Sequence, residues 1–521
     1  MNSSYLFKLP FTCPSQFPIF TRSIISVVFF GSDHYSLPHL HALEERQSQH
    51  KDIRLLFVVT TSDKTPVRYH CIQNKIDHVI WPRTLTNNSI IINAVSQRID
   101  KLQNINSLDK PDKLLGVIVS FGRFLPSSLL SLFNYGCFNI HPSLLPRWKG
   151  SNPLLYTLLA DDKVTGITLF RLNPMHTTFD SGSVLYQKSI LLPCNKNTML
   201  TPNQLATYLM PHSINAMFEV ILYPNLPYLV GVDQSVISAK FQLPITYARK
   251  PQPHMGLINW QEQSAEDIIR YWHAFQGTCV NLFTELCLLN TLQEEKENNS
   301  LIANFRLSEC PLLVPHVDHV SNNNNGQNNA EAADIHCPNS ESKIMDYLNE
   351  ASILLHQPHT SSLPPGSIVY LRSQKDVKHH LIPYTFIACK PNNSSPIITQ
   401  INSVSWLAVK SFLVNWPNSS TKSRHLTAID LYNGYFLKYI QSLSSTLPIS
   451  VVNEGRHSQQ LGVRYFGEFR SNPSSTSSFL SDNNNNGNTL IKPWNELTPA
   501  ILPSDLQSSS DMSIIVKNVH S

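Results

Sequence analysis

From about residue 24 to residue 190, short apolar runs alternate with longer amphipathic stretches. This alternation is typical of an open α/β sheet, in which buried strands are joined by helices that cover the two faces. After the first run, Leu37, Leu40 and Leu43 follow at helical spacing. The strands expected in this region are Ile25–Phe30, Leu55–Thr60, Val79–Trp81, Leu115–Ser120, Cys137–Ile140, Gly166–Leu172 and Leu185–Leu191.

The turn after the first strand resembles the opening of a Rossmann fold but carries little glycine. Gly31-Ser32-Asp33-His34 has one glycine, whereas the dinucleotide fingerprint needs three so that the backbone can approach a pyrophosphate. We therefore expect a Rossmann-like sheet that binds neither a nicotinamide nor a flavin dinucleotide.

A second pattern follows a proline-bearing connector that runs from Leu243 to Pro253. Ser264 and Asp267 have the spacing of a capping box, and an apolar helical face follows them. Many short strand-like runs separated by polar turns then favour a small β-barrel of the OB-like kind. These runs are Asn281–Leu288, Ser367–Leu371, Tyr384–Cys389 and the stretch from Ile397 to Val409.

A chain of 521 residues is too long for one core. We expect a leader at 1–22, an α/β domain at 23–242, a linker at 243–255, a β-barrel domain at 256–446 and a mostly disordered tail at 447–521. An Asn-rich insert at about 316–345 interrupts the barrel, and its low complexity predicts disorder.

Composition indicates the redox compartment and the classes of ligand that the protein can bind. The nine cysteines include no Cys-x-x-Cys pair, which indicates a reducing compartment and argues against a zinc knuckle. His316, His319, His336 and Cys337 match no zinc-ligand spacing, so we expect no metal. The net charge of +4 is compatible with a nucleic-acid partner without requiring one.

The N-terminal leader has the composition of an organelle transit peptide. It is rich in Ser and Thr, contains Lys8 and Arg22, and has no acidic residue before Asp33. Pro10, Pro14 and Pro18 would interrupt the amphipathic helix that such peptides form, so an ordinary leader remains the alternative. The apolar run Ile24–Phe30 is too short to span a bilayer, and we expect no membrane association.

The strongest chemical signal lies at the end of the fifth expected strand. Asn139 and His141 are two residues apart, so their side chains point to the same side of the strand. Both can donate to the oxyanion of an acyl-transfer intermediate, and removing one such donor costs roughly 100- to 1000-fold in rate. Asp180, at the next break in the pattern, offers a carboxylate that would orient the imidazole. A turn aspartate beside a glycine is the alternative explanation of Asp180.

Several ordered segments resemble the 10-formyltetrahydrofolate-dependent formyltransferases, over roughly residues 24 to 445. The main one is Phe138–Gly150, which reads Phe-Asn-Ile-His-Pro-Ser-Leu-Leu-Pro-Arg-Trp-Lys-Gly. The others are Val28–Asp33, Val117–Pro126, Tyr247–Lys250, Ile258–Trp260 and Asp430–Tyr435. The resemblance is greatest to the branch of this family that acts on methionyl-tRNA, in its mitochondrial form.

This resemblance implies catalysis by Asn139, His141 and Asp180, with 10-formyltetrahydrofolate as co-substrate and initiator methionyl-tRNA as acceptor. It also implies a monomer in the mitochondrial matrix. The implied folate contacts are Phe121, Gly122, Arg123, Phe124, Leu125, Met175 and Phe179. The implied tRNA contacts are Lys64, Arg68, Arg147, Lys149, Lys422 and Arg424, with Lys375 and Lys378 as further candidates.

The chain departs from the family pattern in three places. The loop Thr60–Arg68 is short where bacterial relatives carry a long basic loop, Leu172–Asp180 is longer than usual, and Ser183 replaces an Asp common in relatives. Other functions stay open at this point. They are formyl transfer to a small amine, hydrolysis of formyltetrahydrofolate, and RNA binding by a non-catalytic descendant.

Overall fold

The structure is a computed structural model of the chain. It describes residues 24–81, 88–104, 113–173, 178–193, 199–224, 226–288, 301–315, 339–356, 365–371, 373, 380–391, 404–415, 423–433, 464–470 and 512–515.

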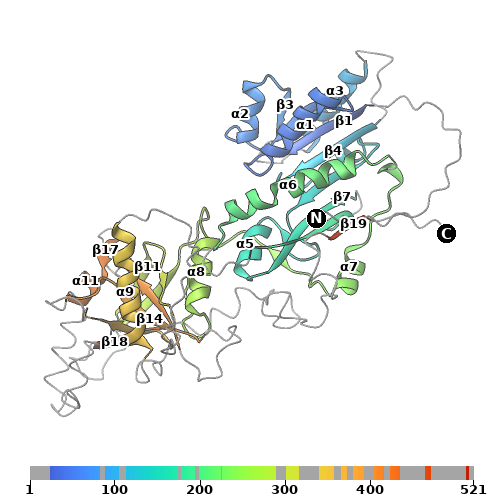
Figure 1. The fold of residues 1–521 in the computed structure, drawn as a ribbon. Helices are drawn as coiled ribbons and strands as arrows, with labels where there is room; N and C mark the ends of the chain where they lie inside the picture. Colours follow the sequence, from blue (N-terminus) through green and yellow to red (C-terminus); the bar gives the residue numbers. More distant parts are fainter. Residues whose placement is uncertain are drawn as a thin grey trace, which may run out of the picture.

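An eight-stranded sheet forms the centre of the N-terminal domain (Figure 1). Its strands lie in the order β19-β8-β7-β5-β4-β1-β2-β3. Strands β1 to β5 are parallel, and β7, β8 and β19 join antiparallel at one side. The strands are β1 (Ile25–Gly31), β2 (Ile53–Thr60), β3 (His78–Ile80), β4 (Lys113–Val119), β5 (Cys137–His141), β7 (Val164–Arg171), β8 (Ser183–Leu191) and β19 (Met512–Ile515). The predicted strands of this region are therefore confirmed, and with them the Rossmann-like class.

Helices cover both faces of this sheet, which explains why its strands are apolar without alternation. On β1, Phe29 packs in one core cluster with Leu40 of α1, whereas the adjacent Phe30 packs in another with Val95 of α3. The helices of this domain are α1 (Leu37–His50), α2 (Pro66–Gln73), α3 (Asn88–Asn104), α4 (Ser127–Leu130), α5 (Pro153–Leu159), α6 (Pro202–Ile221) and α7 (Gln234–Phe241), with the short 3-10 helix η1 (Leu226–Tyr228).

The C-terminal domain is an antiparallel sheet of nine strands, in the order β12-β15-β14-β13-β18-β10-β11-β16-β17. They are β10 (Phe283–Leu288), β11 (Leu301–Leu307), β12 (Leu312–Leu313), β13 (Ser367–Tyr370), β14 (Thr385–Cys389), β15 (Ser405–Val409), β16 (Ser411–Asn415), β17 (Arg424–Thr427) and β18 (Arg464–Arg470). The helices here are η2 (Pro253–Gly256), α8 (Ala265–Ala274), α9 (Asn339–Leu355) and α11 (Ala428–Leu431). A β domain is confirmed. Among the described residues, β12 and β17 do not pair with each other, so closure into an OB-like barrel is not confirmed.

Helix α9 lies partly inside the range expected for the Asn-rich insert, because it begins at Asn339. Its buried face, which includes Leu348 and Leu355, packs against Phe386 and Trp406 of the sheet. Strands β18 and β19 likewise lie inside the range expected for the tail. The core of the insert, residues 316–338, falls outside the described residues, and the remaining domain boundaries stay predictions.

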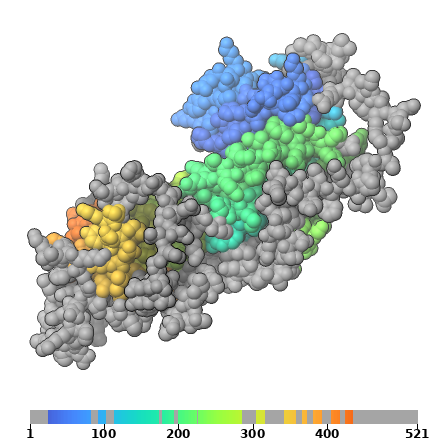
Figure 2. All heavy atoms as spheres, viewed as in Figure 1, coloured from blue at the N-terminus to red at the C-terminus, as the bar shows by residue number. Residues whose placement is uncertain are grey.

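The two domains meet at α8, which Figure 1 shows between them. In Figure 2, the blue surface of the N-terminal domain and the gold surface of α9 lie at opposite ends of the molecule. Leu155 of α5 and Ile268 of α8 belong to one continuous core cluster. Arg270 of α8 pairs with Asp161 across this contact at 3.8 Å. Within the described parts of the chain, no helix combines the length and apolarity needed to cross a membrane.

The predicted capping box at the start of α8 is confirmed and gives a test of the fold. The Ser264 hydroxyl accepts from Asp267 N–H at 3.2 Å, and the Asp267 carboxylate accepts from Ser264 N–H at 2.9 Å. We expect Ser264→Ala to lower the free energy of unfolding by about 1 kcal/mol, because one N-terminal amide loses its acceptor. Urea denaturation followed by circular dichroism measures it. The exposed neighbour substitution Glu262→Ala is the control, and an equal loss in both variants would contradict this role.

Candidate active site

Strand β5 carries Asn139 and His141 to the carboxyl edge of the sheet. The strand lies between β4 and β7, with Asn139 opposite Ile118 on one side and Phe170 on the other. Buried Phe138 and Ile140 alternate with the two polar residues. Asn139 and His141 therefore reach the crevice beyond the parallel strands, where α/β folds bind ligands.

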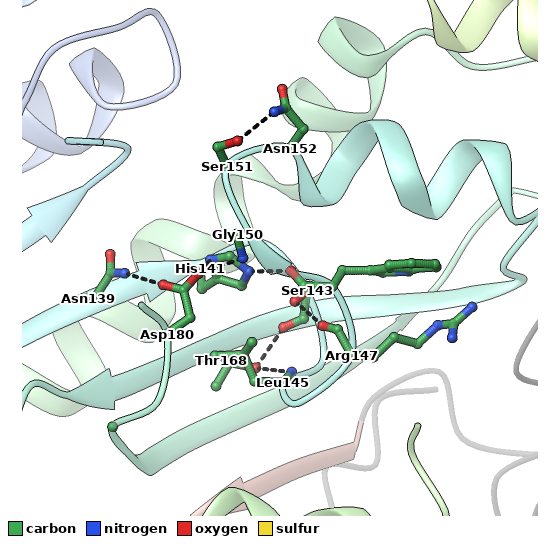
Figure 3. A network of polar contacts seen from close by, with 12 residues as sticks. Asn139, His141, Ser143, Leu145, Arg147, Gly150, Ser151, Asn152, Thr168 and Asp180 are labelled. Atoms are coloured by element: carbon green, nitrogen blue, oxygen red, sulfur yellow. Dashed lines mark hydrogen bonds and ion pairs between the residues drawn. The ribbon is translucent and has the colours of Figure 1, made fainter. Parts of the chain in front are cut away.

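The turn after β5 is held in place by buried polar groups of β7 and β8, and Figure 3 shows the contacts from Thr168 of β7. Thr168 Oγ1 of β7 donates to Ser143 O at 2.6 Å and accepts from Leu145 N–H at 3.1 Å. From β8, Gln187 Nε2 donates to Leu145 O at 2.8 Å. Ser143 Oγ donates to Arg147 O at 2.7 Å and so closes the turn on itself. These hydrogen bonds attach the turn rigidly to β7 and β8.

Arg147 and Trp148 are anchored in the interior by Asp162. Arg147 makes two hydrogen bonds to the Asp162 carboxylate, at 2.6 and 2.8 Å, and Trp148 Nε1 donates to it at 2.7 Å. The Arg147 guanidinium lies over the Trp148 ring, 4.1 Å from its centroid. Only 4% of the Arg147 side chain is exposed. This buried ion pair corrects the expectation that Arg147 contacts tRNA, and it shows that Trp148 packs the turn.

The main-chain carbonyl of Trp148 determines which nitrogen of His141 faces the site. His141 Nε2 lies 2.9 Å from Trp148 O, and a carbonyl can only accept, so Nε2 carries a hydrogen. The other nitrogen, Nδ1, then faces the Asp180 carboxylate, with Oδ2 at 3.9 Å. At that separation the two groups do not form a direct hydrogen bond. A reacting group can therefore interact with both.

Asp180 receives hydrogen bonds from two different segments. Gly150 N–H donates to Oδ2 at 2.7 Å, and Asn139 Nδ2 donates to Oδ1 at 3.4 Å (Figure 3). Gly150 has φ 118°, and a Cβ there would lie 2.7 Å from Ala248 O, so the position requires glycine. The side chains of His141 and Asp180 are 6% and 10% exposed. The structure thus brings together all three residues predicted to be catalytic.

Sequence reasoning missed Gln234, which holds the turn that carries Asp180. From the first position of α7, its Nε2 donates to Asp180 O at 2.8 Å and to Gly182 O at 2.9 Å. Asp180 has φ 53°, a left-handed conformation that a non-glycine residue keeps only when its surroundings impose it. Gln234 is buried and lies 54 residues from Asp180 along the chain, so no local motif points to it.

The strand β9 (Tyr247–Ala248) of the predicted linker pairs in parallel with β6 (Lys149–Gly150). Thr246 reinforces this contact, because its hydroxyl accepts from Trp148 N–H and its carbonyl from Lys149 N–H, both at 2.9 Å. The segment that leads to the C-terminal domain is therefore hydrogen-bonded to the active-site turn.

The residues expected to bind folate divide into two groups. Phe121 and Leu125 are buried in the core beneath the site, where Phe121 packs against Phe30 and Trp81. Phe124 and Phe179 are exposed, and their rings meet edge to face with centroids 5.7 Å apart. Gly122 has φ 66° with open space around it, Arg123 is partly buried, and Met175 lies outside the described residues.

The residues expected to contact tRNA are dispersed. Lys64 and Arg424 are exposed, while Arg68 donates to Asp63 O at 3.0 Å. Lys149 is half-buried; burial lowers its pKa, and the carboxylates of Asp180 and Asp233 oppose that shift. The candidates that lie outside the described residues are Lys375, Lys378 and Lys422.

Comparison with known proteins assigns the chain to a class and then to a family. The pattern of the formyl transferase domain matches residues 25–208. The mitochondrial methionyl-tRNA formyltransferase of Rattus norvegicus is 26% identical over 81% of this chain and 81% of its own length. The methionyl-tRNA formyltransferase of Buchnera aphidicola subsp. Acyrthosiphon pisum (strain APS) is 30% identical over 48% of this chain and 72% of its own length.

Among solved structures, the sugar 3N-formyl transferase WlaRD aligns with 76% of this chain and 99% of its own, at 13% identity and a TM-score of 0.36. The sequence relatives are the stronger finding. The chain is a formyltransferase in class. It belongs to the methionyl-tRNA formyltransferase family, as its motifs predicted.

The anchoring role of Arg147 can be tested by stability. We expect Arg147→Ala to lower the free energy of unfolding by about 3–5 kcal/mol, because it leaves the Asp162 carboxylate buried without its cation. Lys163→Ala is the matched control. Lys163 pairs with Asp161 at 2.6 Å, but both side chains are exposed, so the loss should stay below about 1 kcal/mol. Urea denaturation measures both variants, and similar losses would contradict the anchoring role.

Proposed function

We propose that this protein transfers the formyl group of 10-formyltetrahydrofolate to the α-amine of initiator methionyl-tRNA. The observation that carries the proposal is the convergence of Asn139, His141 and Asp180 at the carboxyl edge of β5, in a chain of this family. The likeness to the rat protein covers 81% of both chains. It therefore extends into the β domain, which favours a tRNA-borne amine over a small one.

The reaction begins when the amine nitrogen attacks the formyl carbon and the carbonyl oxygen becomes an oxyanion. Asn139 Nδ2 is one donor for that oxyanion, and its 3.4 Å contact to Asp180 is long enough to be exchanged at little cost. Protonated His141 is the other donor through Nδ1–H, because Nε2–H stays on Trp148 O. Both His141 and Asp180 are largely buried, and the low local dielectric strengthens such hydrogen bonds.

Proton transfer completes the reaction. As the new C–N bond forms, the attacking nitrogen acquires a positive charge and must lose a proton. The Asp180 carboxylate can accept that proton, while Gly150 N–H keeps Oδ2 oriented. When the bond between the formyl carbon and N10 of tetrahydrofolate breaks, N10 takes up a proton, so the net proton transfer is from the amine to the leaving group.

The folate and the tRNA each need a binding surface next to this centre. We place the folate near the exposed pair Phe124 and Phe179, since apolar rings that meet in solvent offer a stacking surface to a heterocycle. Lys64, Arg68, Lys149 and Arg424 remain the proposed phosphate contacts, which position a nucleic acid rather than specify its sequence. The mitochondrial relatives and the leader composition support a location in mitochondria. Within that proposal, the protein acts in the matrix as a monomer.

We expect Asn139→Ala, His141→Ala and Asp180→Ala each to lower formylation about 100- to 1000-fold, because each removes a group that contacts the reacting atoms. The measurement is the initial rate with charged initiator tRNA and 10-formyltetrahydrofolate, with charged elongator tRNA in parallel. The surface substitution Lys101→Ala on α3 is the control and should retain the full rate. Formylation of free methionine without formylation of the charged tRNA would refute the proposed acceptor.

Gln234 is proposed as a positioning residue that acts through Asp180. We expect Gln234→Met to slow formylation by up to about 100-fold, because the side chain keeps its length but no longer donates to the Asp180 turn. In an Asp180→Asn background the same substitution should cost little more, since coupled residues are not additive. Single-turnover rates of the four proteins give the coupling energy.

Val236→Ala is the matched control for this cycle, because Val236 lies on the same helix and is exposed. Val236→Ala should leave the single-turnover rate unchanged, both in the otherwise unsubstituted protein and in the Asp180→Asn variant. Equal losses from Gln234→Met with and without the Asp180 carboxylate would show that Gln234 does not act through Asp180.

A further inference from the structure

A cluster of two histidines and a glutamate lies on the outer surface of the N-terminal domain, apart from the catalytic residues. His41 and Glu44 are one turn apart on α1, and His70 faces them from α2. Figure 1 shows these two helices near one another at the end of the sheet where β3 lies. The imidazole rings of His41 and His70 have centroids 4.4 Å apart, inclined at 56°. Nothing in the proposed reaction uses these side chains.

Glu44 determines the hydrogen positions of His70. Its Oε2 lies 2.7 Å from His70 Nε2, and an ionised carboxylate can only accept, so Nε2 carries a hydrogen. In the neutral ring, Nδ1 is then left with its lone pair. That lone pair faces His41 Nε2 at 3.2 Å and the side-chain amide of Asn74 at 3.0 Å.

We propose that His41 Nε2 and His70 Nδ1 together bind a divalent transition-metal ion of the zinc class. Two nitrogens at 2.0–2.1 Å from a tetrahedral zinc ion stand roughly 3.3 Å from each other. The two imidazole nitrogens of this site are 3.2 Å apart, so their separation matches that of two ligands of one ion. In the metal-free protein they share a hydrogen bond, and binding therefore requires His41 Nε2 to give up its hydrogen and both rings to turn their lone pairs toward the ion. Imidazole is a preferred ligand of this class of metal.

Glu44 then completes the arrangement that metal-binding histidines require. A ligating histidine almost always donates its other N–H to a carboxylate or carbonyl, which fixes the ring and raises its basicity. The bond from His70 Nε2 to Glu44 supplies this. Asn74 Nδ2 donates to both His70 Nδ1 and His70 O at 3.0 Å, so a bound ion replaces the first of these hydrogen bonds and leaves the second in place. Water completes the coordination.

Sequence spacing does not indicate this site, because His41 and His70 are 29 residues apart and match no zinc-ligand spacing. A bound ion would join α1 to α2 and brace the end of the sheet next to the loop that precedes α2. We therefore expect the ion to stabilise the domain, and the site does not depend on the proposed formyl transfer.

The test is titration of the full chain, first freed of metal with a chelator, with Zn²⁺ alone in competition with a chromophoric chelator. Unsubstituted protein should bind one equivalent more than the His41→Ala/His70→Ala double variant. Glu44→Gln should weaken that equivalent about 10- to 100-fold while leaving the stoichiometry unchanged. His50→Ala, which removes an exposed histidine of α1 outside the cluster, should bind as the unsubstituted protein does.

A second measurement tests whether the bound ion stabilises the domain. Zn²⁺ should raise the thermal midpoint of the unsubstituted protein and of His50→Ala, but not that of the double variant. Mg²⁺, which prefers oxygen ligands, should raise none of them. Circular dichroism confirms that each variant is folded. If the double variant binds Zn²⁺ with the stoichiometry and affinity of the unsubstituted protein, the two imidazoles form only a hydrogen bond and the metal site does not exist.

Discussion

The buried ion pair between Arg147 and Asp162 is the interaction on which the active site depends. It fixes the far end of the turn that leaves β5, and two main-chain groups near that end orient the catalytic side chains. Trp148 O accepts from His141, and Gly150 N–H donates to Asp180. An arginine suits this task because its planar guanidinium bonds a carboxylate through two nitrogens while it stacks on an aromatic ring. The orientation of His141 and Asp180 is thus determined by a charge pair that does not itself take part in the chemistry.

The same turn links catalysis to the C-terminal domain. Strand β9 pairs with Lys149 and Gly150, and the chain then continues through η2 into α8. Helix α8 also packs in one core with α5, so two contacts join the second domain to the first: the β6–β9 pairing and the shared core. A nucleic acid held by the β domain would therefore be positioned relative to Gly150 through a short and hydrogen-bonded path, and not through a loose tether.

The sequence predicted what depends on local pattern. Strands buried on both faces are visible as continuous apolar runs, and the two-residue spacing of Asn139 and His141 identifies a shared direction. It did not predict partners that are distant along the chain. The family resemblance implies that Arg147 contacts tRNA, and nothing local in the sequence shows that Asp162 neutralises it. No local sequence motif indicates that Gln234 contacts the Asp180 turn. Helix α9 has apolar residues at helical spacing, namely Leu348, Ala351 and Leu355, but it directly follows the Asn-rich segment, whose composition predicts disorder.

The catalytic residues lie between positions 139 and 180, but residues much further along the chain hold them in place. Asp180 is held in a left-handed conformation by Gln234, and the turn after His141 is closed by Thr246, 98 residues beyond its partner Trp148. Gly231 approaches so closely that a Cβ there would lie 2.7 Å from the Ser183 side chain, so the returning segment fits tightly against the Asp180 turn. The parallel strands beneath have their own two-sided core. Local opening of the segment from 231 to 248 would therefore disable the site. Because Ile237 and Leu243 of this segment are buried against Phe170, such an opening breaks apolar packing as well as hydrogen bonds, and the sheet with its larger core remains the more stable unit.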